Sequence, residues 1–173
     1  MQIQCQTGAI VEVASDTLQN AKLDGLGLHR AMLDGVSLRE ASLRGTDLRG
    51  ALLCEADLSG ADLEGASLIT TFAMKAKFNA ANLRESRANG CQFDDADLSD
   101  ADLSGADVWS ACFDRATLHG AKLHSNRIET ATFVGAKFDN RTQWPDGFDP
   151  IAAGALLESS APTPDSPPST ARG

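Results

Sequence analysis

Serine, histidine and aspartate recur at equal intervals in the second half of the chain, as Ser99, His119 and Asp139. These are the residue types of a hydrolase triad, in which the imidazole takes the serine proton and the carboxylate orients the imidazole. Such chemistry also needs a pocket that excludes water and N–H groups that stabilise an oxyanion. Whether the three residues can act together therefore depends on the elements that carry them.

Four cysteines offer the other reactive side chains, namely Cys5, Cys54, Cys91 and Cys112. Their spacing matches no metal-binding motif, and no glycine-rich phosphate loop is present, so we expect neither a metal nor a cofactor. No secretory signal and no apolar stretch of membrane-spanning length occurs, so we expect a cytoplasmic protein with reduced thiols and no membrane partner. The net charge of −9 argues against direct binding to nucleic acid and is compatible with a basic protein partner.

The elements that position these residues repeat at a period of five. An apolar residue, most often leucine, occupies every fifth position from Leu18 to Phe138 without an insertion or deletion, and a small residue stands two positions before it. A helix turns about 100° per residue and a strand alternates its faces, so neither keeps residues at this spacing on one side. The pattern predicts a chain that turns once per repeat, with leucine and alanine inside.

The repeats resemble those of the pentapeptide-repeat family, as in Ala56-Asp57-Leu58-Ser59-Gly60 and Ala101-Asp102-Leu103-Ser104-Gly105. This resemblance implies an all-β fold over residues 16–140, a right-handed quadrilateral β-helix with four repeats per coil. About six coils, spaced by about 4.8 Å, would then form a column about 30 Å tall. We expect a weak layer at Ala73 and Ala88, where the large inward residue is missing.

Both ends of an open solenoid need covering. Residues 1–15 alternate apolar and polar positions and predict a hairpin over the first coil. Residues 141–158 contain Trp144 and Phe148, which we expect to cover the last coil, and Asp149-Pro150 predicts the start of a short capping helix. This segment resembles the C-terminal end of cyanobacterial pentapeptide proteins. Residues 159–173 are rich in Ser, Pro and Thr and are expected to be disordered.

Four repeats per coil would stack each residue on the one four repeats later, which places Ser99, His119 and Asp139 in one column. That column lies on a flat, solvated face with no pocket and no evident oxyanion donors, so we interpret the protein as non-enzymatic.

The segment between Arg87 and Arg115 contains no Lys or Arg, and six of its aspartates offer an acidic surface: Asp94, Asp95, Asp97, Asp100, Asp102 and Asp107. They can serve solvation alone, or attract a basic partner. The second interpretation has a parallel in the family, since pentapeptide proteins that confer fluoroquinolone resistance mimic DNA and bind DNA gyrase and topoisomerase IV. Binding of such a topoisomerase is therefore the alternative function, although this chain has no loops between its coils and no long dimerising helix.

A set of apolar residues offers a candidate interface. Met32, Leu52 and Phe72 occupy outward slots that are four repeats apart, with Cys54, Met74 and Ile69 beside them. A contiguous exposed apolar patch usually marks an interface, here with another protein or with a second copy of the chain. The other interpretation is a local register shift that turns Phe72 inward to fill the space left by Ala73. We favour a rigid protein-interaction module or scaffold as the function.

Overall fold

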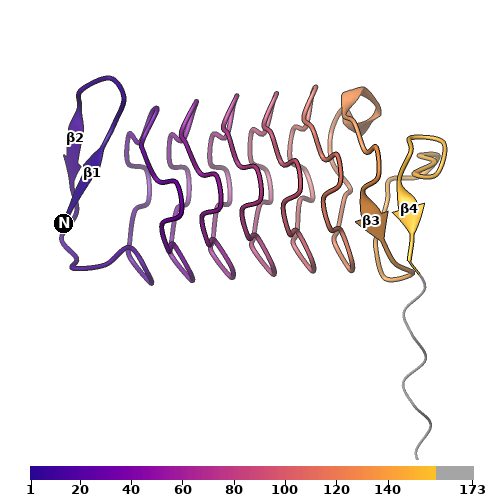
Figure 1. The fold of residues 1–173 in the computed structure, drawn as a ribbon, viewed down its shortest axis with the longest axis horizontal. Helices are drawn as coiled ribbons and strands as arrows, with labels where there is room; N and C mark the ends of the chain where they lie inside the picture. The colour runs from indigo at the N-terminus through magenta and orange to yellow at the C-terminus, as the bar shows by residue number, and fades with distance from the viewer. Residues whose placement is uncertain (159–173) are drawn as a thin grey trace, which may run out of the picture.

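The computed structural model describes residues 1–158; the tail predicted to be disordered, residues 159–173, lies outside the described residues. Stacked coils form a column with a hairpin at one end and two short strands at the other (Figure 1). The named elements are β1 (Gln2–Gln4), β2 (Ile10–Glu12), the 3-10 helix η1 (Ile128–Thr130), β3 (Lys137–Phe138) and β4 (Leu156–Leu157).

Each five-residue repeat contributes one short strand to a side of the column. Residues four repeats apart form parallel bridges, for example Asp57 with Lys77, and this holds from Lys22 to Asp102. The Leu58 N–H donates to the Lys77 carbonyl at 2.7 Å, and the Asp57 N–H donates to the Val36 carbonyl at 3.0 Å. The backbone polar groups are therefore paired between coils, which is the arrangement expected of a β-helix with four repeats per coil.

The turns between strands depend on one residue in the left-handed backbone region. Gly60 has a φ of 68°, and Thr70 adopts the same conformation with a φ of 52°. The turn closes through the N–H of the next alanine, since Ala61 donates to the Leu58 carbonyl at 3.0 Å. Glycine suits this position because it has no Cβ, but the repeated turn is stable enough to hold other residues there.

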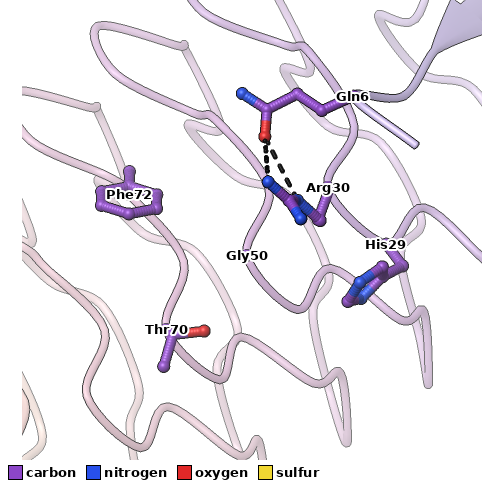
Figure 2. Close-up of a pocket in the computed structure, with 6 residues that line it drawn as sticks. All are labelled: Gln6, His29, Arg30, Gly50, Thr70 and Phe72. Carbon is purple, nitrogen blue, oxygen red and sulfur yellow. Dashed lines mark hydrogen bonds between the residues drawn. The ribbon is translucent and has the colours of Figure 1, made fainter. Parts of the chain in front are cut away.

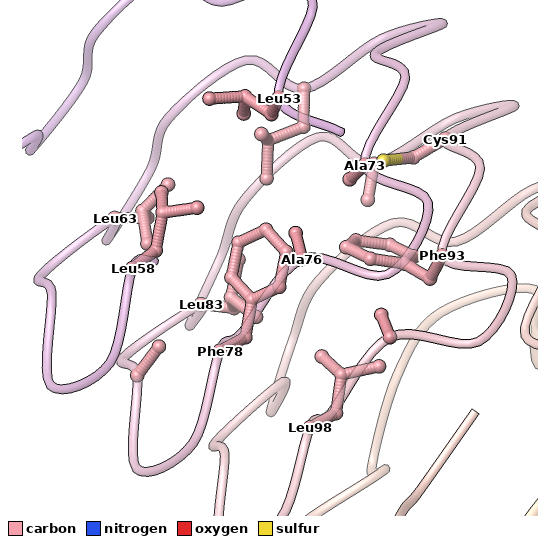
Figure 3. Packing of buried hydrophobic residues seen from close by; sticks show 14 of the residues in the cluster. Leu53, Leu58, Leu63, Ala73, Ala76, Phe78, Leu83, Cys91, Phe93 and Leu98 are labelled. Atoms are coloured by element: carbon pink, nitrogen blue, oxygen red, sulfur yellow. The ribbon is translucent and has the colours of Figure 1, made fainter. Parts of the chain in front are cut away.

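The core consists of the five-spaced apolar residues and the small residues that precede them. The rings of Phe93, Phe113 and Phe133 stack in one column with centroids 5.1 Å apart. Phe78 meets Phe93 edge-on at 5.5 Å, close to the fully buried Ala73 (Figure 3). Aromatic rings therefore lie in the layer where the sequence lacks a large inward residue.

The unbroken period of the sequence conceals one irregular coil. Asp107 pairs with Asn126, one residue short of the regular spacing, and the regular spacing returns with the bridge between Cys112 and Thr132. Here the Asn126 side chain donates to the Gly105 carbonyl at 3.0 Å. The chain then enters η1, which still buries Ile128. Side-chain hydrogen bonds thus replace part of the regular ladder in this coil.

The predicted capping helix is wrong. The Asp149 carboxylate does accept hydrogen bonds from the Ile151 and Ala152 N–H groups, at 3.0 and 3.1 Å, as an N-cap would. The helix does not continue, however, because Gly154 turns the chain at a φ of 91° and leads into β4. Strand β4 pairs parallel to β3, so it satisfies the open edge of the last coil in the way that a helix could not.

Two aromatic residues cover the end of the core beside β4. Trp144 and Phe148 stack on each other at 5.2 Å and meet Phe133 edge-on at 5.3 and 5.5 Å. Trp144 also contacts the ring of Phe138 at 5.5 Å. These contacts extend the aromatic column to the C-terminal end of the described chain.

At the other end, β1 and β2 pair antiparallel to form a hairpin that lies against the first coil. The Met32 N–H donates to the Gln4 carbonyl at 2.8 Å, and the Gln6 N–H donates to the Arg30 carbonyl at 2.9 Å. Cys5 forms an antiparallel bridge with Ala31. The hairpin therefore brings Gln6 beside Arg30, a contact between residues far apart in sequence.

Candidate functional site

The structure does not assemble a triad from Ser99, His119 and Asp139. The Ser99 hydroxyl donates to the Asp97 carboxylate at 2.6 Å. His119 Nε2 lies 3.1 Å from a carboxylate oxygen of Glu158. Among the described residues, no hydrogen bond joins His119 to Ser99 or to Asp139, so the three side chains have separate structural contacts.

Asp139 is an anchor for the last turn. Its carboxylate is largely buried and accepts hydrogen bonds from the Gly120 N–H at 2.9 Å and from Arg141 Nε at 2.9 Å. Burial by itself would raise the pKa of Asp139, but the bonds from Gly120, Arg141 and Thr142 outweigh it and lower that pKa to about 2. The carboxylate is therefore held ionised, in a structural role.

Coil stacking also brings together side chains that the cysteine spacing did not predict. Sγ of Cys112 and carboxylate oxygens of Asp94 and Asp114 all lie within 4.8 Å of one another. Asp114 accepts a hydrogen bond from the Val134 N–H, and Asp94 lies 3.5 Å from Arg115. Burial raises the pKa of the Cys112 thiol, which favours the protonated form over the thiolate that binds metals.

The six candidate acidic residues lie on several sides of the column, and five of them face a basic side chain from a later coil. Asp95 pairs with Arg115 at 3.0 Å, and Asp102 pairs with Lys122 at 3.1 Å. Three others also form ion pairs: Asp94 with Arg115, Asp100 with Arg141 and Asp107 with Arg127. Asp97 instead accepts hydrogen bonds from Ser99 and Asn79. The acidic run is thus interleaved with basic side chains that follow it in sequence.

These ion pairs also affect the carboxylate pKa values. Hydrogen bonds from Arg115 and Arg127 lower the pKa values of Asp95 and Asp107. In Asp102, burial opposes the change, but the bonds from Ser104 and Lys122 still lower the pKa. The sequence signal that could have revealed the pairing is a basic residue four repeats after an aspartate, as in Asp95 and Arg115.

The candidate interface residues occupy one side of the column. Met32, Leu52 and Phe72 are joined by parallel bridges, so their side chains stack outward in the regular register. Phe72 is half-buried and points outward, while Ala73 is fully buried, which excludes the register shift. Met32 is 44% exposed. We call these three residues, with Cys54 and Met74 beside them, the apolar face.

The apolar face differs from the other sides of the column in its charge. The two outward slots of this side, from Met32 and Asp34 to Thr132 and Val134, hold no Lys or Arg. The same side becomes polar beyond the third coil, where Gln92, Cys112 and Thr132 continue the stack. Ile69 lies half-buried around the corner from Phe72. The apolar character is therefore confined to the N-terminal half of one side.

A groove of about 300 Å³ borders the apolar face where the hairpin meets the column (Figure 2). Arg30 is held there by Gln6, whose Oε1 accepts from Nε at 3.2 Å and from Nη2 at 3.1 Å. The groove is not evident from the sequence, because its walls come from the hairpin and from three coils. Its lining residues are Gln6, His29, Arg30, Gly50, Thr70 and Phe72.

Comparisons with known proteins agree with the geometry. The family model for pentapeptide repeats matches residues 17–50, 31–68, 76–108 and 101–140, in eight copies. A crystal structure of the pentapeptide repeat protein Rfr23 from the cyanobacterium Cyanothece 51142 is 29% identical, with a TM-score of 0.53. That match covers 54% of this chain and 64% of Rfr23, so it spans less than two thirds of that protein's length. The comparison with curated proteins gives no match.

Two further solved structures are similar over larger shares of the chain. One is a pentapeptide repeat protein from the Arabidopsis thaliana thylakoid lumen, at 22% identity, 66% coverage of this chain, 72% of that chain and a TM-score of 0.41. The other is QnrB1, a plasmid-mediated fluoroquinolone resistance protein, at 16% identity, 86% coverage of this chain, 88% of that chain and a TM-score of 0.42.

No helix within residues 1–158 is both long enough and apolar enough to cross a membrane. Pentapeptide repeat proteins fold as right-handed quadrilateral β-helices, which confirms the predicted fold class apart from the capping helix. The match to the family model covers more than half of the sequence, and the regular ladder between coils supplies the expected geometry. The chain therefore belongs to the pentapeptide repeat family.

Proposed function

We propose that this protein is a rigid, non-catalytic module that binds another protein through the apolar face. The observation that carries the proposal is the outward stack of Met32, Leu52 and Phe72 on a side with no Lys or Arg in its outward slots. Contiguous apolar surface of this kind marks interfaces in soluble proteins. Pentapeptide repeat proteins generally serve as structural or interaction modules, which is consistent with this function.

The backbone behind the apolar face supports the same function. The strands of Leu52 and Phe72 are hydrogen-bonded to the coil before and to the coil after, and the strand of Met32 is hydrogen-bonded to the hairpin and to the next coil. The face is therefore rigid before a partner arrives. Binding to a rigid surface avoids much of the entropy cost of ordering loops. Met and Phe side chains are also enriched in interface cores.

The alternative function, binding of a type II topoisomerase through the acidic surface, receives less support. A DNA mimic needs an extended field of uncompensated negative charge. Here the aspartates with basic neighbours form ion pairs within the column, as Asp95 does with Arg115 and Asp102 does with Lys122. Gyrase supercoiling, measured with and without the purified protein and a fluoroquinolone, tests this alternative; inhibition or rescue at micromolar protein would support it.

The apolar face is tested by the double variant Met32→Ser and Leu52→Ser. Both side chains point away from the core, so we expect the variant to fold and to lose its partner. The matched control is Ile151→Ser with Leu157→Ser, which removes two exposed apolar residues, 56% and 53% exposed, at the C-terminal end of the column, away from the apolar face.

Light scattering would report a second copy of the chain as the partner, and affinity capture followed by mass spectrometry would report another protein. Each lost hot-spot contact typically costs about 1–2 kcal/mol, or roughly a tenfold weaker complex per residue. The proposal fails if the face variant keeps the wild-type mass and captures the same proteins as the control variant.

A further inference from the structure

Arg30 differs from most arginines of the column in its partner. Seven others form ion pairs with carboxylates: Arg39, Arg44, Arg49, Arg84, Arg115, Arg127 and Arg141. Within residues 1–158, Arg30 has no such partner, and its guanidinium is instead held by the neutral amide of Gln6. The side chain is therefore fixed in position while its charge stays uncompensated.

The hydrogen bonds from Arg30 to Gln6 leave part of the guanidinium for a ligand. Only Nε and Nη2 donate to Gln6, so the Nη1 amino group has no acceptor in the described part of the chain. Carboxylates are bound well by an arginine whose orientation is set in advance, since the planar guanidinium matches the two oxygens.

Gly50 keeps the site open beneath Arg30. A Cβ at this position would lie 3.3 Å from Arg30 Cγ, so a larger residue would displace the arginine stem. Thr70 occupies the equivalent turn of the next coil, and Phe72 follows it on the apolar face. Figure 2 shows Arg30 and Gln6 on one side of the groove, with Phe72 and Thr70 on the other. A fixed cation and an aromatic ring therefore face the same space.

We propose that this groove binds a carboxylate next to an apolar side chain on the partner protein, with the carboxylate on Arg30 and the apolar group on Phe72. The proposal rests on the proposed function, since it names what the partner presents at the edge of the apolar face. Charge complementarity selects the carboxylate, because Arg30 is the uncompensated cation of the groove. The chain's net charge of −9 disfavours a phosphate-rich nucleic acid at the same place.

The test uses the full chain and small probes, with binding followed by NMR shifts of the Gly50, Thr70 and Phe72 amides. The probes are N-acetyl-leucine, its uncharged amide, N-acetyl-glycine and inorganic phosphate. A fourth organic probe, N-acetyl-leucyl-aspartyl amide, carries its carboxylate on a side chain instead of at the chain end. We expect N-acetyl-leucine to bind with a Kd on the order of 1 mM and more tightly than the aspartyl probe, because its carboxylate lies directly beside the apolar side chain.

Removal of either half of the ligand should weaken binding. We expect the leucine amide and N-acetyl-glycine each to bind about tenfold more weakly than N-acetyl-leucine, and Arg30→Gln to weaken N-acetyl-leucine to the level of the amide. The matched control is Arg87→Gln, which removes the same charge from another arginine with no ion-pair partner among residues 1–158 and should leave binding unchanged.

Equal binding of N-acetyl-leucine and its amide would overturn the proposal, as would equal effects of Arg30→Gln and Arg87→Gln. Phosphate binding as tight as that of N-acetyl-leucine would overturn it too, since the apolar half would then contribute nothing. The double variant Met32→Ser and Leu52→Ser leaves Arg30 and Phe72 in place. If the double variant keeps its partner while the probes still bind, the apolar face is refuted and the groove is not. If the double variant loses its partner while the probes fail to bind the wild-type protein, the groove is refuted and the apolar face is not.

Discussion

Replacing Asp139 by Asn should destabilise the column in a pH-dependent way. The folded-state pKa of Asp139 is about 2, against an ordinary value of 3.8. Each unit of difference corresponds to about 1.36 kcal/mol, so ionisation of this carboxylate contributes about 2 kcal/mol of stability at neutral pH. Asparagine can still accept the Gly120 hydrogen bond, and we therefore expect a loss of about 1–2 kcal/mol at pH 7.

The sign of the pH dependence follows from a folded-state pKa that is lowered. The contribution of Asp139 is present above pH 3.8 and is lost as the pH falls through about 2, below which the wild-type side chain is mostly protonated and resembles asparagine. The free-energy difference between wild type and Asp139→Asn should therefore shrink toward zero between these two pH values. Other carboxylates titrate in both proteins and cancel from this difference.

The assay is urea unfolding of both proteins at pH 7 and near pH 2, followed by far-ultraviolet circular dichroism and by hydrogen exchange of the last coil. Hydrogen exchange is included because the end of a solenoid can unfold separately. Asp146→Asn is the control, because the Asp146 carboxylate has no hydrogen bond or ion pair in the described chain. A difference at pH 7 that persists unchanged near pH 2, or none at pH 7, would refute the reasoning.

Three further outcomes are expected. Leu58→Asp should abolish the folded circular dichroism signal, because it places an unpaired charge at a fully buried position between coils. Phe113→Ala should cost about 3–5 kcal/mol in chemical unfolding, since the ring is fully buried and stacks on two others; a cost below that of Leu118→Val would contradict this. Ending the chain before Trp144 should cause aggregation in light scattering, because Phe133 and Phe138 lose their cover.

Most of the fold could be predicted from the sequence because one local rule applies in every repeat. The inward position of Leu58, the small residue before it and the turn after it all follow from a single repeat of sequence. The capping helix could not be predicted correctly, because Asp149 and Pro150 signal a helix start while the later course depends on pairing with β3. The irregular coil at Asn126 was hidden because the bridge spacing is one residue short there and is regular again at Thr132, so the five-residue period of the sequence is unchanged.

The candidate surfaces were predictable only where they depended on spacing alone. The stack of Met32, Leu52 and Phe72 follows from their four-repeat spacing, and the structure has it in that register. The ion pairs of the acidic surface did not follow from the run of aspartates itself, because Arg115 lies at the end of the run in sequence and beside Asp95 in space. The groove at Arg30 required the docked position of the hairpin, which no pattern within the repeats encodes.

The constant bridge spacing of four repeats limits how such a chain can change in length during evolution. Loss of a single repeat between Leu52 and Phe72 would rotate every later residue to the neighbouring side of the column, and Phe72 would no longer lie above Leu52. Loss or duplication of a complete coil would preserve every side and change only the height. A lineage that retains a partner on one side should therefore gain and lose whole coils within the contacted region, while single-repeat changes should be found only outside it.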